Sequence, residues 1–294
     1  MDSRSIAVAA SRGMLRAAVV ASSLLVAGLH DARPVTAAPR PTTWTIDAIR
    51  YATVPAFPVH ELVTGADTTR RLDIAMMVWL LRAPGHRVLV DAGFYRQKFL
   101  DSWKPADYLL PSAAVARAGV PAESVTDIII SHVHWDHLDG ADLFPNARIW
   151  IQREEYSYYV RDDGTPAHGA IDSLDAAMLA GLMKTGHVTL IEGDAKPILP
   201  GLTAYTGGKH TYASQYVGVR MAKGTAVVAS DNCYLYENLE KHLPIAQTLD
   251  ATSNLAAQDR MKTIASNPRL IVPGHDPAVF QRFHGAVPGV VRIE

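Results

Sequence analysis

The sequence predicts an α/β protein of the α+β type, built as a sandwich of two β-sheets with helices on the outer faces. Three observations support this fold class. The 294 residues, 48% of them hydrophobic, suffice for a large domain with a buried core. Beyond residue 38 there is no short-period repeat and no low-complexity tract. The chain then runs twice through several strands, a helix and a strand, which fits a sandwich better than a doubly wound parallel sheet.

The N-terminal segment has the pattern of a secretory signal. Arginines precede the apolar stretch AAVVASSLLVAG (17–28), and small residues follow it. The apolar run is too short to span a bilayer. We therefore predict a signal peptide over 1–38, cleaved near Ala37 or Ala38, and one periplasmic or secreted domain over 39–294 with no membrane span. The alternative is an alanine-rich N-terminus behind a wrongly assigned start.

The first half of the domain is expected to begin with three strands. TWTIDAIRYATV (43–54) alternates as a strand does, and LDIAMMVWLLRAPGHRVLVDAGF (72–94) contains two apolar strands joined by the turn APGH. In the segment 94–120, Pro111 and Ser112 favour a helix start and Gly119 a helix end. The β-branched run in SVTDIIISH (124–132) and the segment ARIWIQ (147–152) predict two further strands.

The second half is expected to repeat this order. A helix is predicted over 171–186, where apolar residues recur at helical spacing. Four short strands follow in HVTLIEGD (187–194), LTAYTGGKH (202–210), SQYVGVRM (214–221) and TAVVASDN (225–232). A second helix is predicted over 253–266 with Ser253 as its N-cap. PRLIVPGHDP (268–277) closes the pattern with a strand and a turn.

Charge and cysteine content exclude several functions. The formal net charge is −1 and no basic patch or charge run occurs, so we expect no nucleic-acid partner. The single cysteine, Cys233, excludes an internal disulfide and a cysteine-built zinc finger. We expect Cys233 to be a small packed residue.

The stretch IIISHVHWDHLDG (128–140) places metal-binding groups at the end of an apolar strand. In an extended segment His132 and His134 point to the same side, so both imidazoles can bind one ion. Asp136 and His137 follow in a turn and face a second position. Burying so many ionisable groups without partners is costly, which makes ordinary packed histidines the weaker interpretation. The cluster therefore suits two adjacent metals that take further ligands from elsewhere.

The motif SHVHWDH resembles the signature of the metallo-β-lactamase superfamily. The resemblance implies an αββα sandwich of two mixed β-sheets with a metal site at one sheet edge. It also implies three more ligands from later loops, and the chain offers His210 in YTGGKHTYASQ, Asp231 in VVASDN and His275 in IVPGHDP. Each residue follows a predicted strand.

A narrower resemblance is to the N-acyl-homoserine lactonases. It rests on DNCYLYENLEKHLP, which contains Asp231 and Tyr234, and on LIEGDAKPILPGLTAYTGGKHT, and it spans roughly residues 72–280. In the second segment Lys209 stands directly before His210, and GGKHTYASQ replaces the second Gly-His of that family. By this resemblance the substrate is a lactone, and a homodimer is an expected assembly.

The resemblance assigns roles to the site residues. One zinc takes His132, His134 and His210, the other takes Asp136, His137 and His275, and Asp231 bridges both. Two such ions turn a shared water into hydroxide near neutral pH for attack on an ester or lactone carbonyl. Tyr234 donates a hydrogen bond to the reacting oxygen, and Asp136 shuttles the proton.

Several alternatives stay open at this point. The same fold hosts hydrolases of aryl esters, thioesters, organophosphates and halogenated aromatics, and also proteins that bind without turnover. Manganese, cobalt or iron could replace zinc. Asp91 either orients a ligand imidazole or only caps its turn. Trp135 and other aromatic residues near the expected mouth either line a pocket or only pack: Phe94, Tyr95, Trp103, Tyr156, Tyr158 and Tyr159.

Overall fold

The computed structural model describes residues 41–294. The predicted signal peptide, residues 1–38, lies outside the described residues. Among residues 41–294, no helix has both the length and the apolar composition that crossing a bilayer requires.

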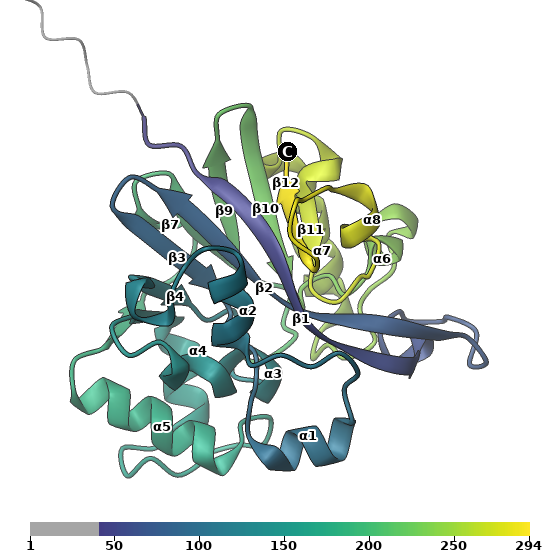
Figure 1. Ribbon diagram of the computed structural model, residues 1–294. Helices are drawn as coiled ribbons and strands as arrows, with labels where there is room; N and C mark the ends of the chain where they lie inside the picture. The colour runs from purple at the N-terminus through teal and green to yellow at the C-terminus, as the bar shows by residue number, and fades with distance from the viewer. Residues whose placement is uncertain (1–40) are drawn as a thin grey trace, which may run out of the picture. The chain divides into compact units, whose positions relative to one another are not determined.

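The larger sheet contains seven strands and is mixed (Figure 1). Their order across the sheet is β12 (Val290–Ile293), β1 (Thr45–Pro58), β2 (Arg71–Ala83), β3 (His86–Val90), β4 (Asp127–Ile129), β5 (Arg148–Gln152) and β6 (Val188–Ile191). The strands from β12 to β3 pair antiparallel, and those from β3 to β6 pair parallel.

The smaller sheet contains five strands and is mixed as well. Their order is β11 (Ile271–Pro273), β10 (Gly224–Ser230), β9 (Gln215–Met221), β8 (Leu202–Thr206) and β7 (Lys196–Leu199). Only β10 and β11 pair parallel, because the chain between them crosses over through helices. The predicted fold class, two mixed sheets with helices outside, is confirmed.

Eight α-helices connect the strands of the described chain. They are α1 (Gln97–Trp103), α2 (Pro111–Arg117), α3 (Trp135–Leu138), α4 (Arg153–Tyr159), α5 (Ser173–Lys184), α6 (Tyr236–Lys241), α7 (Ala251–Ile264) and α8 (Val279–Arg282). Short 3-10 turns lie at Val59–Glu61, Ala122–Ser124, Asp139–Leu143 and Pro268–Leu270.

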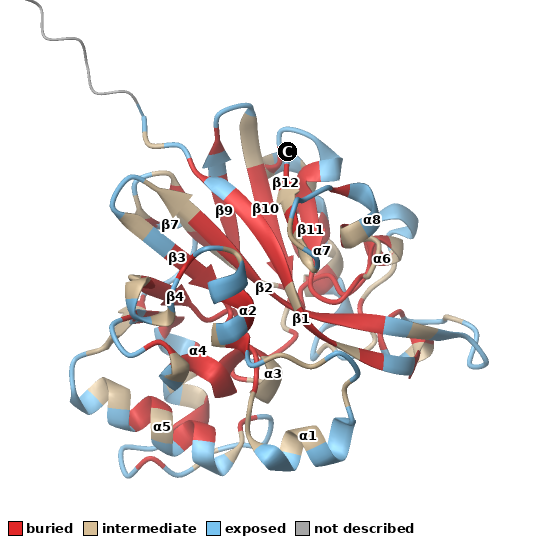
Figure 2. Ribbon diagram, viewed as in Figure 1, coloured by how far each residue is buried: buried red, intermediate tan, exposed pale blue. Residues whose placement is uncertain are grey.

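Three apolar layers hold these elements together, because successive strand residues point to opposite faces of a sheet. Trp79 and Val90 of the larger sheet meet Val217 and Val228 of the smaller one between the sheets. On the outer face of the larger sheet, residues such as Leu80 pack against α2 and α5. On the outer face of the smaller sheet, β10 and β11 pack against α7. Figure 2 shows the strands mostly buried and the outward sides of α1 and α5 exposed.

The expected elements are largely present, with one wrong cap. The helix predicted over 253–266 is α7, but its N-cap is Asp250, whose carboxylate accepts from the backbone N–H of Ser253 at 3.1 Å. Ser253 contributes only that N–H, because the carboxylate one turn earlier already satisfies the first turn. Several short elements were not predicted: β7, β12, α1, α3, α4, α6 and α8.

One edge of the sandwich gathers the ends of several strands. β4 ends two residues before Ser131, β10 directly before Asp231 and β11 directly before Gly274. The two sheets are joined at this edge, where Gln215 N–H donates to the carbonyl of Ser131 at 2.8 Å. The segments after these strands carry the predicted site residues, so residues remote in sequence meet here.

Candidate metal centre

The segment from His132 to His137 folds as the spacing predicts. His134 has extended backbone and forms the N-cap of α3, and the N–H of His137 donates to its carbonyl at 3.1 Å. His132 Nε2 lies 3.0 Å from His134 Nδ1, so both imidazoles face one point. Asp136 and His137 lie in the first turn of α3, and their side chains face a second point.

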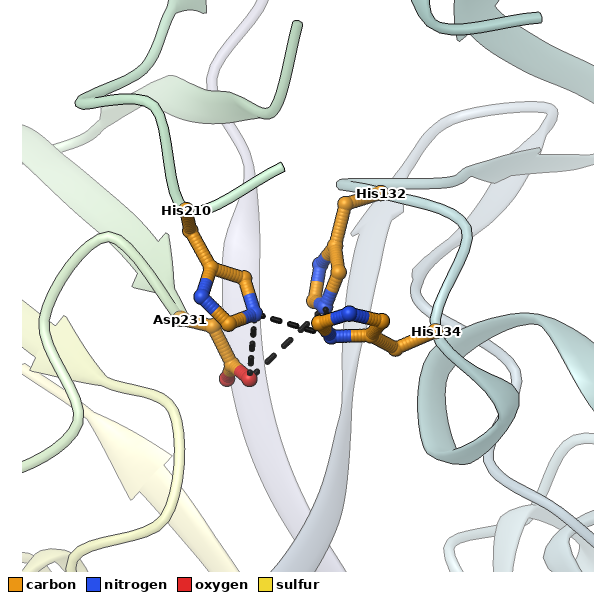
Figure 3. A group of neighbouring side chains, drawn as sticks. All are labelled: His132, His134, His210 and Asp231. Carbon is orange, nitrogen blue, oxygen red and sulfur yellow. Dashed lines mark hydrogen bonds and ion pairs between the residues drawn. The ribbon is translucent and has the colours of Figure 1, made fainter. Parts of the chain in front are cut away.

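The first ligand group comprises His132, His134, His210 and Asp231 (Figure 3). Its ligand atoms all lie within 4.8 Å of one another. His210 Nε2 is 2.9 Å from His134 Nδ1 and 3.5 Å from Asp231 Oδ2. His210 comes from the glycine-rich loop after β8, so three separate segments build this group.

The second ligand group comprises Asp136, His137 and His275. His275 Nε2 lies 3.6 Å from Asp136 Oδ2, and His137 Nε2 lies 3.5 Å from the same oxygen. Asp231 reaches this group too: its Oδ1 is 3.0 Å from His275 Nε2 and its Oδ2 is 3.2 Å from His137 Nε2. The structure therefore brings all seven predicted ligands together, with Asp231 between the two groups.

Hydrogen bonds on the far side of the rings fix which nitrogen faces the centre. His210 Nδ1 lies 2.7 Å from the carbonyl of Gln247, and His275 Nδ1 lies 3.1 Å from that of Ala75. Carbonyl oxygens only accept, so each of these Nδ1 atoms carries a proton, and the neutral ring that binds a metal has its free electron pair on Nε2. The Nε2 atoms are the ones that converge with the carboxylates.

Asp91 orients the ring of His137 and does more than cap a turn. Its Oδ2 lies 2.8 Å from His137 Nδ1, and it accepts from Ser131 N–H and the Ser230 hydroxyl at 2.8 Å each. Asp91 is fully buried and adopts φ +61°, a strained backbone at the end of β3. A carboxylate behind a ligand imidazole is a common feature of metal sites.

The donor set fits divalent cations. His137 Nε2 and Asp231 Oδ1 are buried and make no hydrogen bond to any described residue, although other ligand atoms surround them. Burial and the neighbouring imidazoles lower the pKa of His132 well below its usual value, and burial lowers the pKa of His134 to about 3. These rings are therefore neutral, the form that binds metal. Five imidazoles and two carboxylates match the ligands that zinc prefers.

Gly274 lets the second ligand group assemble. A Cβ atom added there would lie 2.4 Å from Asp231 Oδ1, a distance no real contact reaches. The turn that carries His275 can therefore pack directly on the bridging carboxylate only with glycine at this position.

A cavity of about 150 Å³ opens beside the second ligand group. Its polar side is formed by His134, Asp136, Asp231, Tyr234, Gln247 and His275. Its apolar lining comes from the far ends of β1 and β2, the 3-10 turn after β1, α1 and α3: Val54, Phe57, Leu62, Ile74, Met76, Trp103 and Trp135. Figure 1 shows these ends of β1 and β2 extending past the rest of the larger sheet.

Trp135 both lines the cavity and packs, so the two open interpretations are both correct. Its ring stacks on Phe99 at 4.7 Å and on Trp103 at 5.1 Å between centroids. Trp103 stacks in turn on Phe57 at 6.0 Å. Of the other aromatic residues considered for the mouth, only Trp103 lines the cavity. Phe94 is fully buried beneath Trp135.

Tyr234 presents a neutral phenol to the cavity. Burial, then the carboxylates of Asp231 and Asp136, raise its pKa well above the usual value. Its hydroxyl lies 3.4 Å from His210 Nδ1, whose proton already points at Gln247. The phenol proton is therefore available for a group bound in the cavity. Cys233, the residue before Tyr234, is fully buried against the smaller sheet and α7, as expected for a packed residue.

The family model for the metallo-beta-lactamase superfamily matches residues 77–275, and the chain belongs to this superfamily. With this fold and site, it is a metal-dependent hydrolase. An N-acyl homoserine lactonase of Bacillus cereus is 28% identical over 221 residues, covering 70% of this chain and 82% of that one. The N-acyl homoserine lactonase AttM of Azorhizobium caulinodans is 29% identical over 183 residues, covering 59% of this chain and 66% of that one.

Solved structures share the fold. A quorum-quenching N-acyl homoserine lactone lactonase superposes with a TM-score of 0.69 at 20% identity, covering 84% of this chain and 98% of that one. The dizinc quorum-quenching lactonase AidC superposes with a TM-score of 0.62 at 14% identity, covering 86% of this chain and 95% of that one.

Proposed function

We propose that this protein opens the ring of N-acyl homoserine lactones by hydrolysis with two zinc ions. The observation that carries the proposal is the position of Asp231, whose two oxygens lie within 3.0 to 3.5 Å of imidazoles from both ligand groups. The N-acyl homoserine lactonases among its relatives support the substrate class. Tyr234, at the cavity wall, supports the same branch.

The two ligand groups would each hold one ion. His132, His134 and His210 would hold the first, Asp136, His137 and His275 the second, and Asp231 both. When bound, the ions would lower the pKa of a water between them and polarise the lactone carbonyl.

Two side chains of the chain would handle protons and charge at the reacting ester. The neutral phenol of Tyr234 would donate a hydrogen bond to the oxygen that gains charge as the carbonyl is attacked. Asp136 faces the cavity with one carboxylate oxygen among the ligand atoms. Its other oxygen would carry the proton to the alkoxide that leaves when the ring C–O bond breaks.

The apolar part of the cavity would hold the acyl chain. The walls from β1, β2 and the aromatic side chains of Trp103 and Trp135 exclude water from that side of the lactone. A ligand whose polar head faces the metals and whose tail faces these walls matches the lining. The aromatic walls could also hold an aryl ester, so the test includes one.

The test is a hydrolysis screen on purified protein with zinc measured in the same sample. N-butanoyl-, N-hexanoyl- and N-decanoyl-homoserine lactone are each supplied, with a thioester, a phosphotriester and an aryl ester in parallel. Ring opening releases a proton, which a pH indicator follows, and mass spectrometry identifies the hydroxy acid. We expect the lactones to be turned over with the highest kcat/KM.

Two controls separate metal chemistry from contamination. Asp231→Ala removes the bridging carboxylate, and a chelator removes the metal, so both should abolish turnover while circular dichroism shows a folded chain. Turnover that survives both treatments would exclude this site as its source. A higher kcat/KM for one of the other esters would replace the lactone as substrate and keep the metal centre.

We further propose that the mature protein acts outside the cytoplasm. The charged, apolar and small-residue order of residues 1–38 supports this, since it is that of a secretory signal. N-terminal sequencing of protein from the periplasm or medium tests it, and we expect a start at residue 38 or 39.

A further inference from the structure

A buried acidic residue of α4 lies behind the first ligand group. Glu155 is the third residue of α4, and its side chain is fully buried, whereas its neighbour Glu154 is exposed. Burying a carboxylate is costly unless hydrogen bonds compensate it. Its partners therefore indicate what the residue does.

The carboxylate of Glu155 is bonded to both segments that carry the imidazoles of the first ligand group. Its Oε1 accepts from the N–H of Val133 at 3.1 Å and from the hydroxyl of Thr211 at 2.6 Å. Its Oε2 accepts from the N–H of Ala213 at 2.7 Å. Val133 stands between His132 and His134 in the chain. Thr211 directly follows His210, so one side chain spans the two segments.

Two tyrosines of α4 reinforce the contact with the His210 loop. The hydroxyl of Tyr159 accepts from the N–H of Tyr212 at 3.2 Å. The ring of Tyr158 stacks on that of Tyr212 at 3.9 Å, with the two planes 1° apart. Helix α4 thus contacts both the backbone and the side chain of Tyr212 in the His210 loop.

The His210 loop needs such support because its backbone is strained. Lys209, the residue before His210, adopts φ +59°, a conformation that residues with a Cβ atom rarely take. Strained backbone persists where the surroundings fix it. Gly207 and Gly208, just before Lys209, pack so closely on Asn232 and Asn254 that a Cβ atom at either position would clash.

Asp91 offers a comparison at the other metal position. It is a buried carboxylate bonded to the ring of His137, a member of the second ligand group. Glu155 differs because it contacts the backbone and a hydroxyl beside the ligands and no ligand ring. Asp91 also reaches the first group indirectly, because the Ser131 hydroxyl that it binds at 3.0 Å lies 2.8 Å from His132 Nδ1. Of these two carboxylates, Glu155 is the one bonded to the His210 loop.

We propose that Glu155 is a positioning residue that sets the spacing of His132, His134 and His210 and thereby the zinc affinity of the first ligand group. The inference rests on the metal centre proposed above. Losing Oε1 as an acceptor would break the bonds to Val133 and Thr211, and losing Oε2 would break the bond to Ala213. Either loss loosens the His210 loop relative to the other two imidazoles, which would then converge less well. The second ligand group, which has no bond to Glu155, would keep its affinity.

The experiment measures zinc affinity at one position at a time. His275→Ala removes a ligand of the second group and leaves the first, and His210→Ala does the reverse. Glu155→Gln is introduced into each, because glutamine keeps the shape but replaces one acceptor oxygen with a donor. Glu154→Gln, one residue earlier and exposed, is the matched control.

Zinc affinity is measured by competition with a chromophoric chelator, and Co²⁺ absorption in the visible range reports the ligand geometry. We expect Glu155→Gln to weaken zinc binding about 10- to 100-fold in the His275→Ala background, the range typical of residues that support metal ligands. The Co²⁺ spectrum should change there too. In the His210→Ala background, and with Glu154→Gln in either, affinity and spectrum should stay unchanged.

Other results would overturn the inference. Unchanged zinc affinity in both backgrounds would refute the role of Glu155 and leave the proposed metal centre standing. An equal loss in both would show a general loosening of the fold and would also refute a selective role for Glu155. If neither His210→Ala nor His275→Ala lowers zinc stoichiometry, the metal centre itself is wrong. Should Glu155→Gln fail to fold, Thr211→Val removes one of the three bonds, and the same selective loss or its absence decides.

Discussion

The Nδ1 atom of His137 and the Oδ2 atom of Asp91 lie 2.8 Å apart in a fully buried hydrogen bond. The bond sets the ring so that Nε2 faces the carboxylates of the second ligand group. A carboxylate partner also makes the imidazole a stronger donor to a metal.

Replacing Asp91 with asparagine should weaken the second metal position. The asparagine side chain would keep one acceptor oxygen, but its other polar atom is a donor that would face hydroxyl and imidazole protons. We expect zinc affinity at this position to fall about 10- to 100-fold, and turnover at limiting zinc to fall with it. Competition with a chelator measures the affinity.

Excess zinc should restore much of the turnover of Asp91→Asn, because the ligands themselves are still present. Asp101→Asn, an exposed change on α1, serves as the control. Two tightly bound ions in Asp91→Asn, at wild-type affinity, would contradict the role of this contact.

Replacing Tyr234 with phenylalanine should slow ring opening without removing metal. The phenol is neutral and faces the cavity, so the change removes one hydrogen-bond donor and little volume. We expect kcat for a lactone to fall on the order of 100-fold, the scale for one donor at a developing negative charge. Steady-state kinetics with zinc content measured in parallel provide the check.

Unaltered lactone turnover in Tyr234→Phe would argue against the lactonase branch even though the fold and the superfamily stand. A loss of zinc in the same variant would instead show that the phenol supports His210, from which it is separated by 3.4 Å.

Much of the site could be predicted because its residues follow strands that the sequence marks clearly. Three histidines and Asp136 lie within six residues after a β-branched run, and Asp231 and His275 each follow a short apolar run. Local pattern indicates where such strands end, and strand ends meet at a sheet edge. Local pattern therefore indicated the first four ligands, and the resemblance to the metallo-β-lactamase superfamily supplied His210, Asp231 and His275.

Glu155 could not be predicted in the same way. Its partners lie 22, 56 and 58 residues away along the chain, and no spacing in the sequence links them. The strand β12 was missed for a similar reason. Its four residues, at the C-terminus of the sequence, pair with β1 near the start of the described residues. So short an apolar run carries no strand signal of its own.

Shortening Trp103 should change which acyl chain is preferred. Its ring, 37% exposed, closes the cavity wall by stacking between Phe57 and Trp135. In Trp103→Ala we expect the ratio of kcat/KM for N-decanoyl to N-butanoyl homoserine lactone to rise several-fold, because the cavity of about 150 Å³ would open outward. The lost aromatic contacts should cost about 1 kcal/mol of stability.

Leu110→Ala is the control for Trp103→Ala, because Leu110 is 38% exposed and does not line the cavity. Its chain-length preference should match that of the wild type. An unchanged ratio in Trp103→Ala, with turnover intact, would place the acyl chain elsewhere.

A buried acid pair outside the metal centre should make stability depend on pH. Asp175 of α5 and Asp139 both contact Arg96, and both carboxyls are fully buried. Burial, then the charge of Asp139, raise the pKa of Asp175 to about 8. The usual value in an unfolded chain is about 3.9.

Between about pH 4 and pH 8 the folded chain therefore holds a proton on Asp175 that the unfolded chain releases. The stabilising contribution is complete below this range and is lost as the pH rises through it, by at most about 1.4 kcal/mol per pH unit.

Asp175→Asn removes this titration. We expect its free energy of unfolding to fall less than that of the wild type between pH 5 and pH 8. Urea unfolding of both proteins at saturating zinc measures the difference, in which effects of the metal centre cancel. A difference that does not change with pH would show that Asp175 is already ionised at pH 5.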